Sequence, residues 1–188
     1  MARLPQITER TGLRHEQAAV FDSIASGARG SVRGPHTILL HRPELADPMD
    51  GLGTYVRYDC AIPERQRELL ILVVAAHWRA DYVWPAHAPL AARAGIAETV
   101  IAAVGHGETP AFDALDDALV HRATAEVLAT RRMSDETYGP AEARFGGPGV
   151  LDLIGLIGYY SAIAMVLNVF EVGPGQTQSY PWSDQVVP

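Results

Sequence analysis

The stretch that decides the fold is residues 68–87, which read ELLILVVAAHWRADYVWPAH. Its apolar residues recur at spacings of three and four, which predicts a helix that begins at Pro63 and ends near Arg79. Proline fits the first turn of a helix because its missing N–H has no partner to lose there. Asp81 is a suitable cap for a second helix over residues 82–94. The sequence therefore predicts two helices joined by a very short connection.

Similar spacing of apolar residues predicts further helices on both sides of this stretch. They cover residues 12–24, 44–57, 98–104, 112–130 and 151–170. A short helix is expected from Ser134, and the glycines of residues 146–149 should break the chain after it. No segment alternates with period two for long enough to indicate a sheet. The predicted fold class is therefore all-α, with loops of the lengths that connect packed helices.

The chain divides by pattern into three parts. Residues 1–33 are expected to form an N-terminal arm and a short helix, residues 34–172 a helical domain, and residues 173–188 a tail rich in proline and glycine. Residues 26–35 are rich in glycine but lack the Gly-Lys-Ser/Thr ending of a phosphate-binding loop. We interpret them as a flexible connector.

Composition excludes several classes of function. A net charge of −7 opposes binding to nucleic acid or to anionic membranes, because phosphates attract a positive surface. The single cysteine, Cys60, excludes an internal disulfide and any Cys-x-x-Cys pair. The N-terminus shows no apolar leader. Residues 151–170 approach membrane-spanning length, but Asp152 and Asn168 within them favour a buried core helix. The expected location is the cytoplasm, without a membrane partner.

Two residues of the deciding stretch suit acid–base chemistry. Glu68 shares the helical spacing of apolar neighbours, and a buried carboxylate must be paired or protonated. Spacing alone nevertheless favours a solvent-exposed Glu68, since charged residues are mostly exposed. His87 falls in the first turns of its helix, whose N-terminus disfavours a charged imidazolium. Considered alone, His87 is better interpreted as a histidine that satisfies its own hydrogen bonds.

Other polar groups give weaker signals. The seven histidines show no metal-binding spacing, so we expect neither a metal nor a cofactor. Asp117 and His121 lie one turn apart on a charged helix face, which favours a solvated pair. Acidic Asp59 beside Cys60 would not stabilise a thiolate, so we interpret Cys60 as an inert thiol.

The sequence resembles the carboxymuconolactone decarboxylase-like family of the alkyl hydroperoxidase D-like superfamily. The runs that carry the resemblance are residues 63–76, 80–87, 91–96 and 156–172, and it extends over about residues 34–172. It implies an alkyl hydroperoxidase D-like helical bundle and a homo-oligomer, a trimer or hexamer. In the hydroperoxidase branch, a glutamate and a histidine relay protons to a Cys-x-x-Cys pair. Glu68 and His87 match that relay, but Ala80 and Val83 occupy the cysteine positions.

The missing thiols imply an enzyme closer to the decarboxylase branch. We expect a cysteine-free lyase or isomerase that acts on a small carboxylate or lactone, with His87 as the acid–base group and Glu68 orienting it. Tyr82, Trp84 and Tyr159 are candidates for lining the substrate pocket, although core packing explains these aromatic residues equally well. The alternatives are a peroxidase or antioxidant protein, and a non-catalytic oligomeric protein that binds a small molecule.

Overall fold

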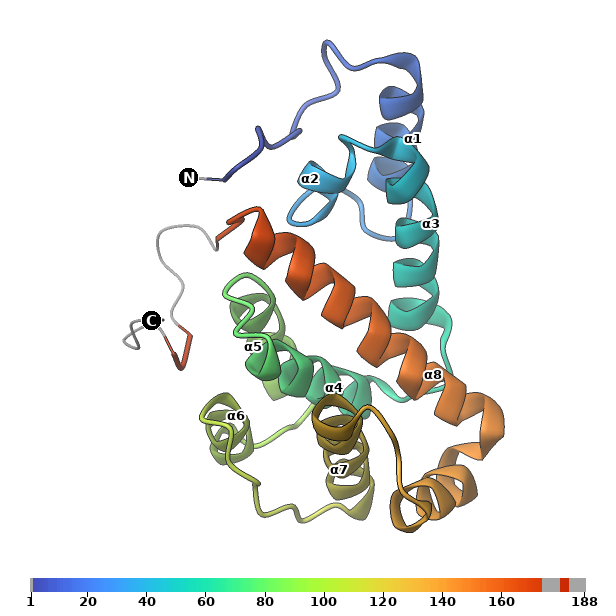
Figure 1. The fold of residues 1–188 in the computed structure, drawn as a ribbon, viewed down its shortest axis with the longest axis vertical. Coiled ribbons are helices and arrows are strands. Elements are labelled where there is room, and N and C mark those ends of the chain that lie inside the picture. Colours follow the sequence, from blue (N-terminus) through green and yellow to red (C-terminus); the bar gives the residue numbers. More distant parts are fainter. Residues whose placement is uncertain (1, 174–179, 183–188) are drawn as a thin grey trace.

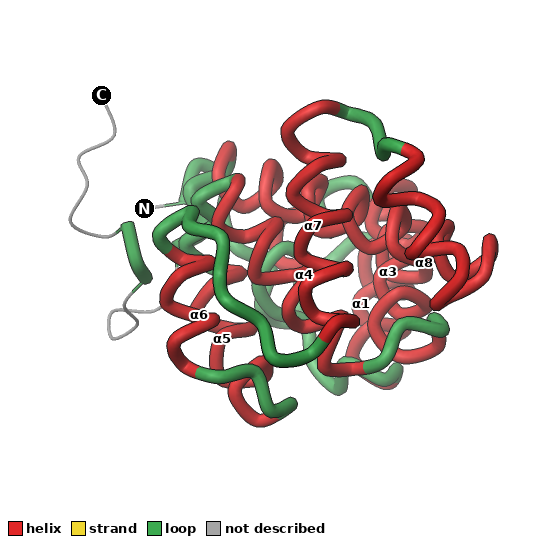
Figure 2. Tube along the Cα trace, turned by 90° about the horizontal axis from the view of Figure 1, so that it is seen from below, coloured by secondary structure: helices red, strands yellow, loops and turns green. Residues whose placement is uncertain are grey.

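The computed structural model describes residues 2–173 and 180–182, which form an all-helical bundle as predicted (Figure 1). No strand occurs in these two ranges (Figure 2). The α-helices are α1 (His15–Ser26), α2 (His36–Leu39), α3 (Pro43–Thr54), α4 (Glu64–His77), α5 (Val83–Arg93), α6 (Glu98–Gly105), α7 (Leu115–Thr130) and α8 (Asp135–Val169), and a π-helical turn, η1 (Tyr55–Asp59), follows α3.

Helix α4 lies at the centre of the bundle. All seven residues of Leu69–Ala75 are buried, so this helix has no solvent-facing side. A helix that is apolar all round is stable only when neighbours cover every face. Helices α5, α7 and α8 provide that cover, and α8 runs diagonally between α1–α3 and α4–α7 (Figure 1). A polar side chain in the buried middle of α4 is thereby forced to find its partner inside the protein.

The predicted continuous helix over residues 44–57 is interrupted. The chain leaves α-helical pairing after Thr54, and the Cys60 N–H donates to the Tyr55 carbonyl, five residues back, at 2.9 Å. One extra residue in a turn rotates the side chains that follow it, and such π-helical turns are frequent at functional sites. Arg57 lies in this turn.

The predicted break at residues 146–149 is a kink. Gly146 has φ 71° and ψ 167°, which divides α8 into a shorter N-terminal part and a long apolar part. Glycine suits this position because other residues rarely adopt a positive φ. Long apolar helices of this kind also meet the length and composition required to cross a membrane, but over half of the most apolar part of α8 is buried inside the bundle. Helix α8 therefore serves as a core helix of this fold.

The two ends of the chain contact the bundle. The Arg3 N–H donates to the Phe170 carbonyl, and the Ile7 N–H donates to the Thr37 carbonyl. The expected arm is thus packed along α2 and the end of α8. Of the expected tail, Trp182 is buried, whereas residues 174–179 and 183–188 lie outside the described residues.

Candidate active site

A cavity of about 550 Å³ opens between the glycine-rich loop, η1, α5 and the long part of α8. Its lining residues are Arg29, Ser31, Arg33, Pro35, His36, Arg57, Tyr58, Tyr82, Val83, Pro85, Ala86, His87, Leu90, Tyr159, Tyr160, Ile163 and Leu167. Among the residues that the structure describes, three arginines line it and no aspartate or glutamate does. In a chain of net charge −7, this is a local concentration of positive charge suited to an anionic or strongly hydrogen-bonding ligand.

Glu68 and His87 meet at this cavity. His87 Nδ1 lies 2.7 Å from Glu68 Oε2, and the two residues are 5% and 3% exposed. The preference for a solvent-exposed Glu68 was therefore wrong, because α4 is covered on every face. The carboxylate sits behind the imidazole, which itself lines the cavity.

The hydrogen-bond network indicates the tautomer of His87. Its Nε2 lies 3.4 Å from Arg57 Nη1. A guanidinium only donates hydrogen bonds, so Nε2 carries the lone pair and the Nδ1–H donates to Glu68. A carboxylate on one ring nitrogen fixes the orientation of the imidazole and leaves the other nitrogen available. The accessible basic atom of the site is therefore His87 Nε2.

Burial keeps this imidazole neutral. It lowers the pKa of His87 below its ordinary value, against the Glu68 carboxylate, which raises it. The positive charge of Arg57 acts in the same direction as burial. At neutral pH, His87 is therefore an unprotonated base rather than an acid.

Arg57 and Tyr160 complete this end of the cavity. The Tyr160 ring stands nearly perpendicular to the His87 ring, with 5.3 Å between centroids. Arg57 Nη1 donates to the Tyr160 hydroxyl at 3.5 Å. Burial raises the pKa of Tyr160, so the phenol keeps its proton. Because that hydroxyl accepts from Arg57, its own O–H is free to donate to a ligand.

The three aromatic residues that were candidates for lining the pocket lie in two different places. Tyr82 and Tyr159 line the cavity, but Trp84 does not. Trp84 is buried on another side of α5, where its ring meets Trp182 edge-on at 5.4 Å. Trp182 in turn donates to the Asp81 carboxylate at 2.6 Å. Trp84 thus anchors residues 180–182, because neighbouring residues of one helix point in different directions.

Two other expectations concern residues outside the cavity. The Cys60 thiol donates to the Val56 carbonyl at 3.0 Å and is not a lining residue. Asp117, expected to be solvated, is buried and binds Arg65 at 2.7 Å and Gln66 at 2.8 Å. That expectation was wrong because this face of α7 packs on α4. Residues 2–173 and 180–182 contain no cluster of three or more potential metal ligands.

Sequence reasoning missed the arginines of the site. Arg29 and Arg33 belong to the glycine-rich loop, which was interpreted only as a connector. Arg57 was assigned to the end of an ordinary helix. The available signal was the placement of two arginines among glycines, because such a loop lets long cationic side chains approach a neighbouring helix.

Comparisons with known proteins agree with this architecture. Residues 43–126 match the model of the carboxymuconolactone decarboxylase family. A crystal structure from Ralstonia eutropha JMP134, described as an alkylhydroperoxidase AhpD core of an uncharacterized peroxidase-related protein, superposes with a TM-score of 0.74. The two chains are 16% identical, and the match covers 100% of this chain and 98% of that one.

A second solved structure has the same fold. It is an uncharacterized peroxidase-related protein from Silicibacter sp. TM1040, with a TM-score of 0.71 and 13% identity. The match covers 96% of this chain and 94% of that one. A search among curated proteins found no match. At these identities the structural likeness establishes the fold, and the chemistry has to be argued from the cavity itself.

Proposed function

We propose that this chain, whose residues 43–126 match the carboxymuconolactone decarboxylase family and which has the alkyl hydroperoxidase D-like fold, is a cysteine-free lyase or isomerase. It moves protons on a small carboxylate or lactone by means of His87 and Glu68. The observation that carries this proposal is the 2.7 Å contact between His87 Nδ1 and Glu68 Oε2. This contact leaves Nε2 directed toward an arginine at a cavity lined by cations.

The proposed reaction begins with His87 as the base. Its Nε2 takes a proton from a carbon next to a carbonyl group, and the C–H electron pair moves to the carbonyl oxygen. Arg57 and the Tyr160 hydroxyl donate to the enolate oxygen that forms, as in an oxyanion hole. Glu68 stabilises the imidazolium. Return of the proton to a different carbon gives isomerisation, and loss of a leaving group from the neighbouring carbon gives elimination.

The neutral state of His87 favours these two reactions over direct decarboxylation. When CO2 leaves, the C–C electron pair stays on the substrate, and the carbon then needs a proton from an acid. His87 would have to be protonated beforehand, which its buried position disfavours. Isomerase or elimination chemistry therefore fits the cavity better than decarboxylation within this proposal.

A thiol peroxidase has less support. Peroxide reduction of that kind needs a thiolate within reach of the substrate. Ala80 and Val83 stand at the positions that correspond to the two cysteines, and Cys60 lies outside the cavity lining. The peroxidase-related descriptions of the two structural neighbours belong to those proteins.

We also propose that the protein forms a homo-oligomer through exposed apolar side chains of η1 and α8. Tyr55 and Tyr58 are 47% and 46% exposed, and Leu151 and Val169 are 72% and 54% exposed. Large exposed apolar side chains are frequent in contacts between subunits. Light scattering coupled to size exclusion measures the mass in solution. A monomer at all concentrations would contradict this proposal.

The test of the reaction uses deuterium exchange. The wild-type protein in D2O is incubated with a panel of lactones, β-keto acids and unsaturated carboxylic acids, and NMR follows deuterium entering the carbon next to the carbonyl. His87→Gln should lower exchange about 10²- to 10⁴-fold, the usual contribution of a general base. The matched control is His15→Gln, because His15 is exposed on α1 away from the cavity.

The pH profile provides a second criterion. Because burial lowers the pKa of His87, the rate should be constant around pH 7 and fall only below the ordinary histidine value of about 6.5. Exchange that survives in His87→Gln would refute the assignment of the base. If a compound of the panel binds but no compound exchanges deuterium, the result would instead favour a non-catalytic binding protein.

A further inference from the structure

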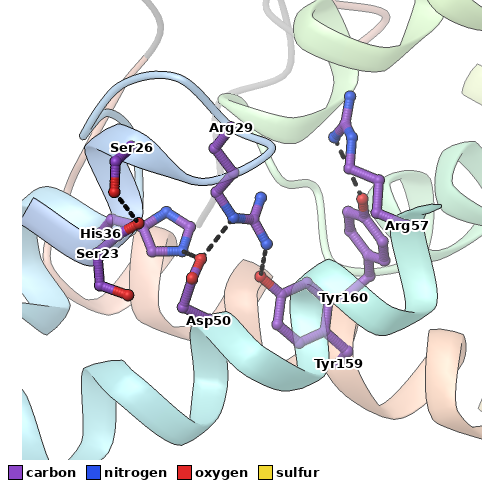
Figure 3. Close-up of polar contacts among 8 residues, drawn as sticks. All are labelled: Ser23, Ser26, Arg29, His36, Asp50, Arg57, Tyr159 and Tyr160. Atoms are coloured by element: carbon purple, nitrogen blue, oxygen red, sulfur yellow. Dashed lines mark hydrogen bonds and ion pairs between the residues drawn. The ribbon is translucent and has the colours of Figure 1, made fainter. Parts of the chain in front are cut away.

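The cavity contains a second polar cluster that the proposed proton transfer does not use. It consists of Arg29 from the glycine-rich loop, His36 from α2, Asp50 from α3 and Tyr159 from α8 (Figure 3). Arg29 Nε donates to Asp50 Oδ1 at 2.6 Å, and Arg29 Nη2 donates to the Tyr159 hydroxyl at 3.2 Å. Four separate segments of the chain therefore contribute to one cluster.

Asp50 orients Arg29 from the side that faces away from the cavity. Asp50 is not a lining residue, whereas Arg29, His36 and Tyr159 are. The carboxylate holds the Nε edge of the guanidinium, so the other edge is directed to the hydroxyl of Tyr159. That hydroxyl accepts from Arg29, which leaves its O–H free to donate. Burial raises the pKa of Tyr159, so the phenol remains protonated. This end of the cavity therefore presents donors to a ligand.

The contact between Arg29 and Tyr159 depends on a glycine. A Cβ added at Gly53 of α3 would overlap the Tyr159 hydroxyl and the Arg29 guanidinium. Gly51 lies in the same helix and has nothing within 4 Å of its added Cβ. Glycine inside a helix is less favourable than alanine, so its presence at a helical position calls for a packing reason. Gly53 therefore has a packing role that Gly51 lacks.

His36 presents a buried ring nitrogen at this end of the cavity. It is 3% exposed and lines the cavity, and its Nε2 lies 3.2 Å from Asp50 Oδ1, the oxygen that also accepts from Arg29. This contact lacks hydrogen-bond geometry, so Nε2 has no hydrogen-bond partner among the described residues. A buried polar atom without a hydrogen bond is costly and typically marks a functional position.

The charge of the cluster favours an anion. Arg29 and Asp50 neutralise each other, and burial lowers the pKa of His36 to about 4, so His36 is neutral at pH 7. Arg33, on the same loop, lines the cavity and has no ion pair among the described residues. One positive charge is therefore left at this end of the cavity. Arginine binds carboxylates through several donors at once.

We propose that Arg29, Arg33, His36 and Tyr159 form a carboxylate-binding subsite. The substrate then has two polar groups, a carboxylate and a separate reacting carbonyl. Its carboxylate binds at this subsite, and its reacting carbonyl lies at His87, Arg57 and Tyr160. Tyr159 and Tyr160 are consecutive residues with ring centroids 5.2 Å apart, so the carboxylate and the reacting carbonyl bind side by side in one cavity. This inference rests on the proposed function for the reacting end and adds the anchoring end.

The test measures binding separately from turnover. Isothermal titration calorimetry compares adipate, its monomethyl ester and hexane-1,6-diol as probes with the full chain. The subsite predicts that adipate and the monoester bind and that the diol binds at least tenfold more weakly. Arg33→Gln, at an exposed position that should not affect folding, should weaken adipate binding about tenfold, because it removes a charge-assisted hydrogen bond.

Three further variants separate this inference from the proposed function. Arg29→Lys should recover part of the affinity that Arg29→Met loses, and thermal melting checks that both variants fold. His15→Gln should bind adipate as the wild type does, because His15 is exposed on α1 and does not line the cavity. The subsite is refuted if no carboxylate probe binds, if the diol equals adipate, or if Arg33→Gln and Arg29→Met bind adipate unchanged. Loss of exchange activity in His87→Gln has no bearing on these results.

Discussion

The two ends of the cavity use the same four kinds of group, a carboxylate, an imidazole, a guanidinium and a phenol, in different ways. One end has Glu68, His87, Arg57 and Tyr160, and the other has Asp50, His36, Arg29 and Tyr159. Glu68 accepts from the imidazole, and the arginine faces His87 Nε2. Asp50 accepts from the arginine, and the imidazole lies 3.2 Å from the same carboxylate oxygen without a hydrogen bond.

The difference shows that the role of each end depends on which side chain the carboxylate orients, the imidazole or the guanidinium. An imidazole oriented by a carboxylate is suited to proton transfer, because the imidazolium it forms is stabilised. A guanidinium oriented by a carboxylate is suited to fixed donation, because it cannot lose its proton. We therefore assign proton transfer to the Glu68 end and anchoring to the Asp50 end.

Neutralising each carboxylate should have the largest effect and should affect different kinetic constants at the two ends. Glu68→Gln removes the charge that stabilises the His87 imidazolium, so turnover should fall about 10²-fold or more with little change in KM. Asp50→Asn only loosens Arg29, so KM should rise about tenfold with kcat nearly unchanged. Steady-state kinetics on a substrate found in the exchange panel measures both. Equal effects on kcat would mean that the two ends do not differ in role.

Stability against pH tests the environment of His36. Its pKa is about 4 in the folded protein and about 6.5 when unfolded, so the unfolded chain takes up a proton first as the pH falls. Stability from His36 is therefore complete above pH 6.5 and is lost toward pH 4, by about 3 kcal/mol in total.

His36→Gln should remove this part of the slope. Urea unfolding at pH 7.5, 5.5 and 4 measures it. His15→Gln, at an exposed position, should leave the slope unchanged. An identical slope in wild type and His36→Gln would show that His36 is not held neutral by burial.

A pair of glycine variants tests the packing of the anchoring end, with a smaller expected effect. Gly53→Ala should displace Arg29 and Tyr159 and weaken adipate binding about tenfold, since it disturbs a charge-assisted hydrogen bond. Gly51→Ala should bind normally and melt at the same or a higher temperature, because alanine is the better helix former. Calorimetry and thermal melting measure both. Parallel behaviour of the two variants would contradict the packing role of Gly53.

The smallest effect is expected at Cys60. Its thiol bonds to the Val56 carbonyl outside the cavity lining. Cys60→Ser preserves a donor, so exchange activity should change less than about twofold, as is usual for a change away from the reacting groups. Peroxide consumption with a dithiol reductant, measured in parallel, should be negligible in both proteins. Peroxidase activity that disappears in Cys60→Ser would overturn the cysteine-free proposal.

Local patterns were sufficient to predict most of the helices. The apolar run before His77 and the proline at residue 63 predicted α4 within two residues at each end. They were insufficient for the turn at η1, because the helical spacing of apolar residues continues through Val56 and gives no sign of π-helical pairing. They also failed for Asp117, because a spacing of four residues says nothing about which face of α7 meets a neighbour.

The sequence by itself determined that the chain is all-helical, since periodicity depends on residues a few positions apart. Its resemblance to the carboxymuconolactone decarboxylase family pointed to Glu68 and His87 as acid–base candidates and to the absence of cysteines at positions 80 and 83. Only the tertiary structure decided that Glu68 is buried against His87, that Trp84 faces away, and that three arginines line one cavity. Arg29, Arg57 and Tyr159 are separated by up to 130 residues in sequence, and the meeting of such distant side chains follows from how helices pack.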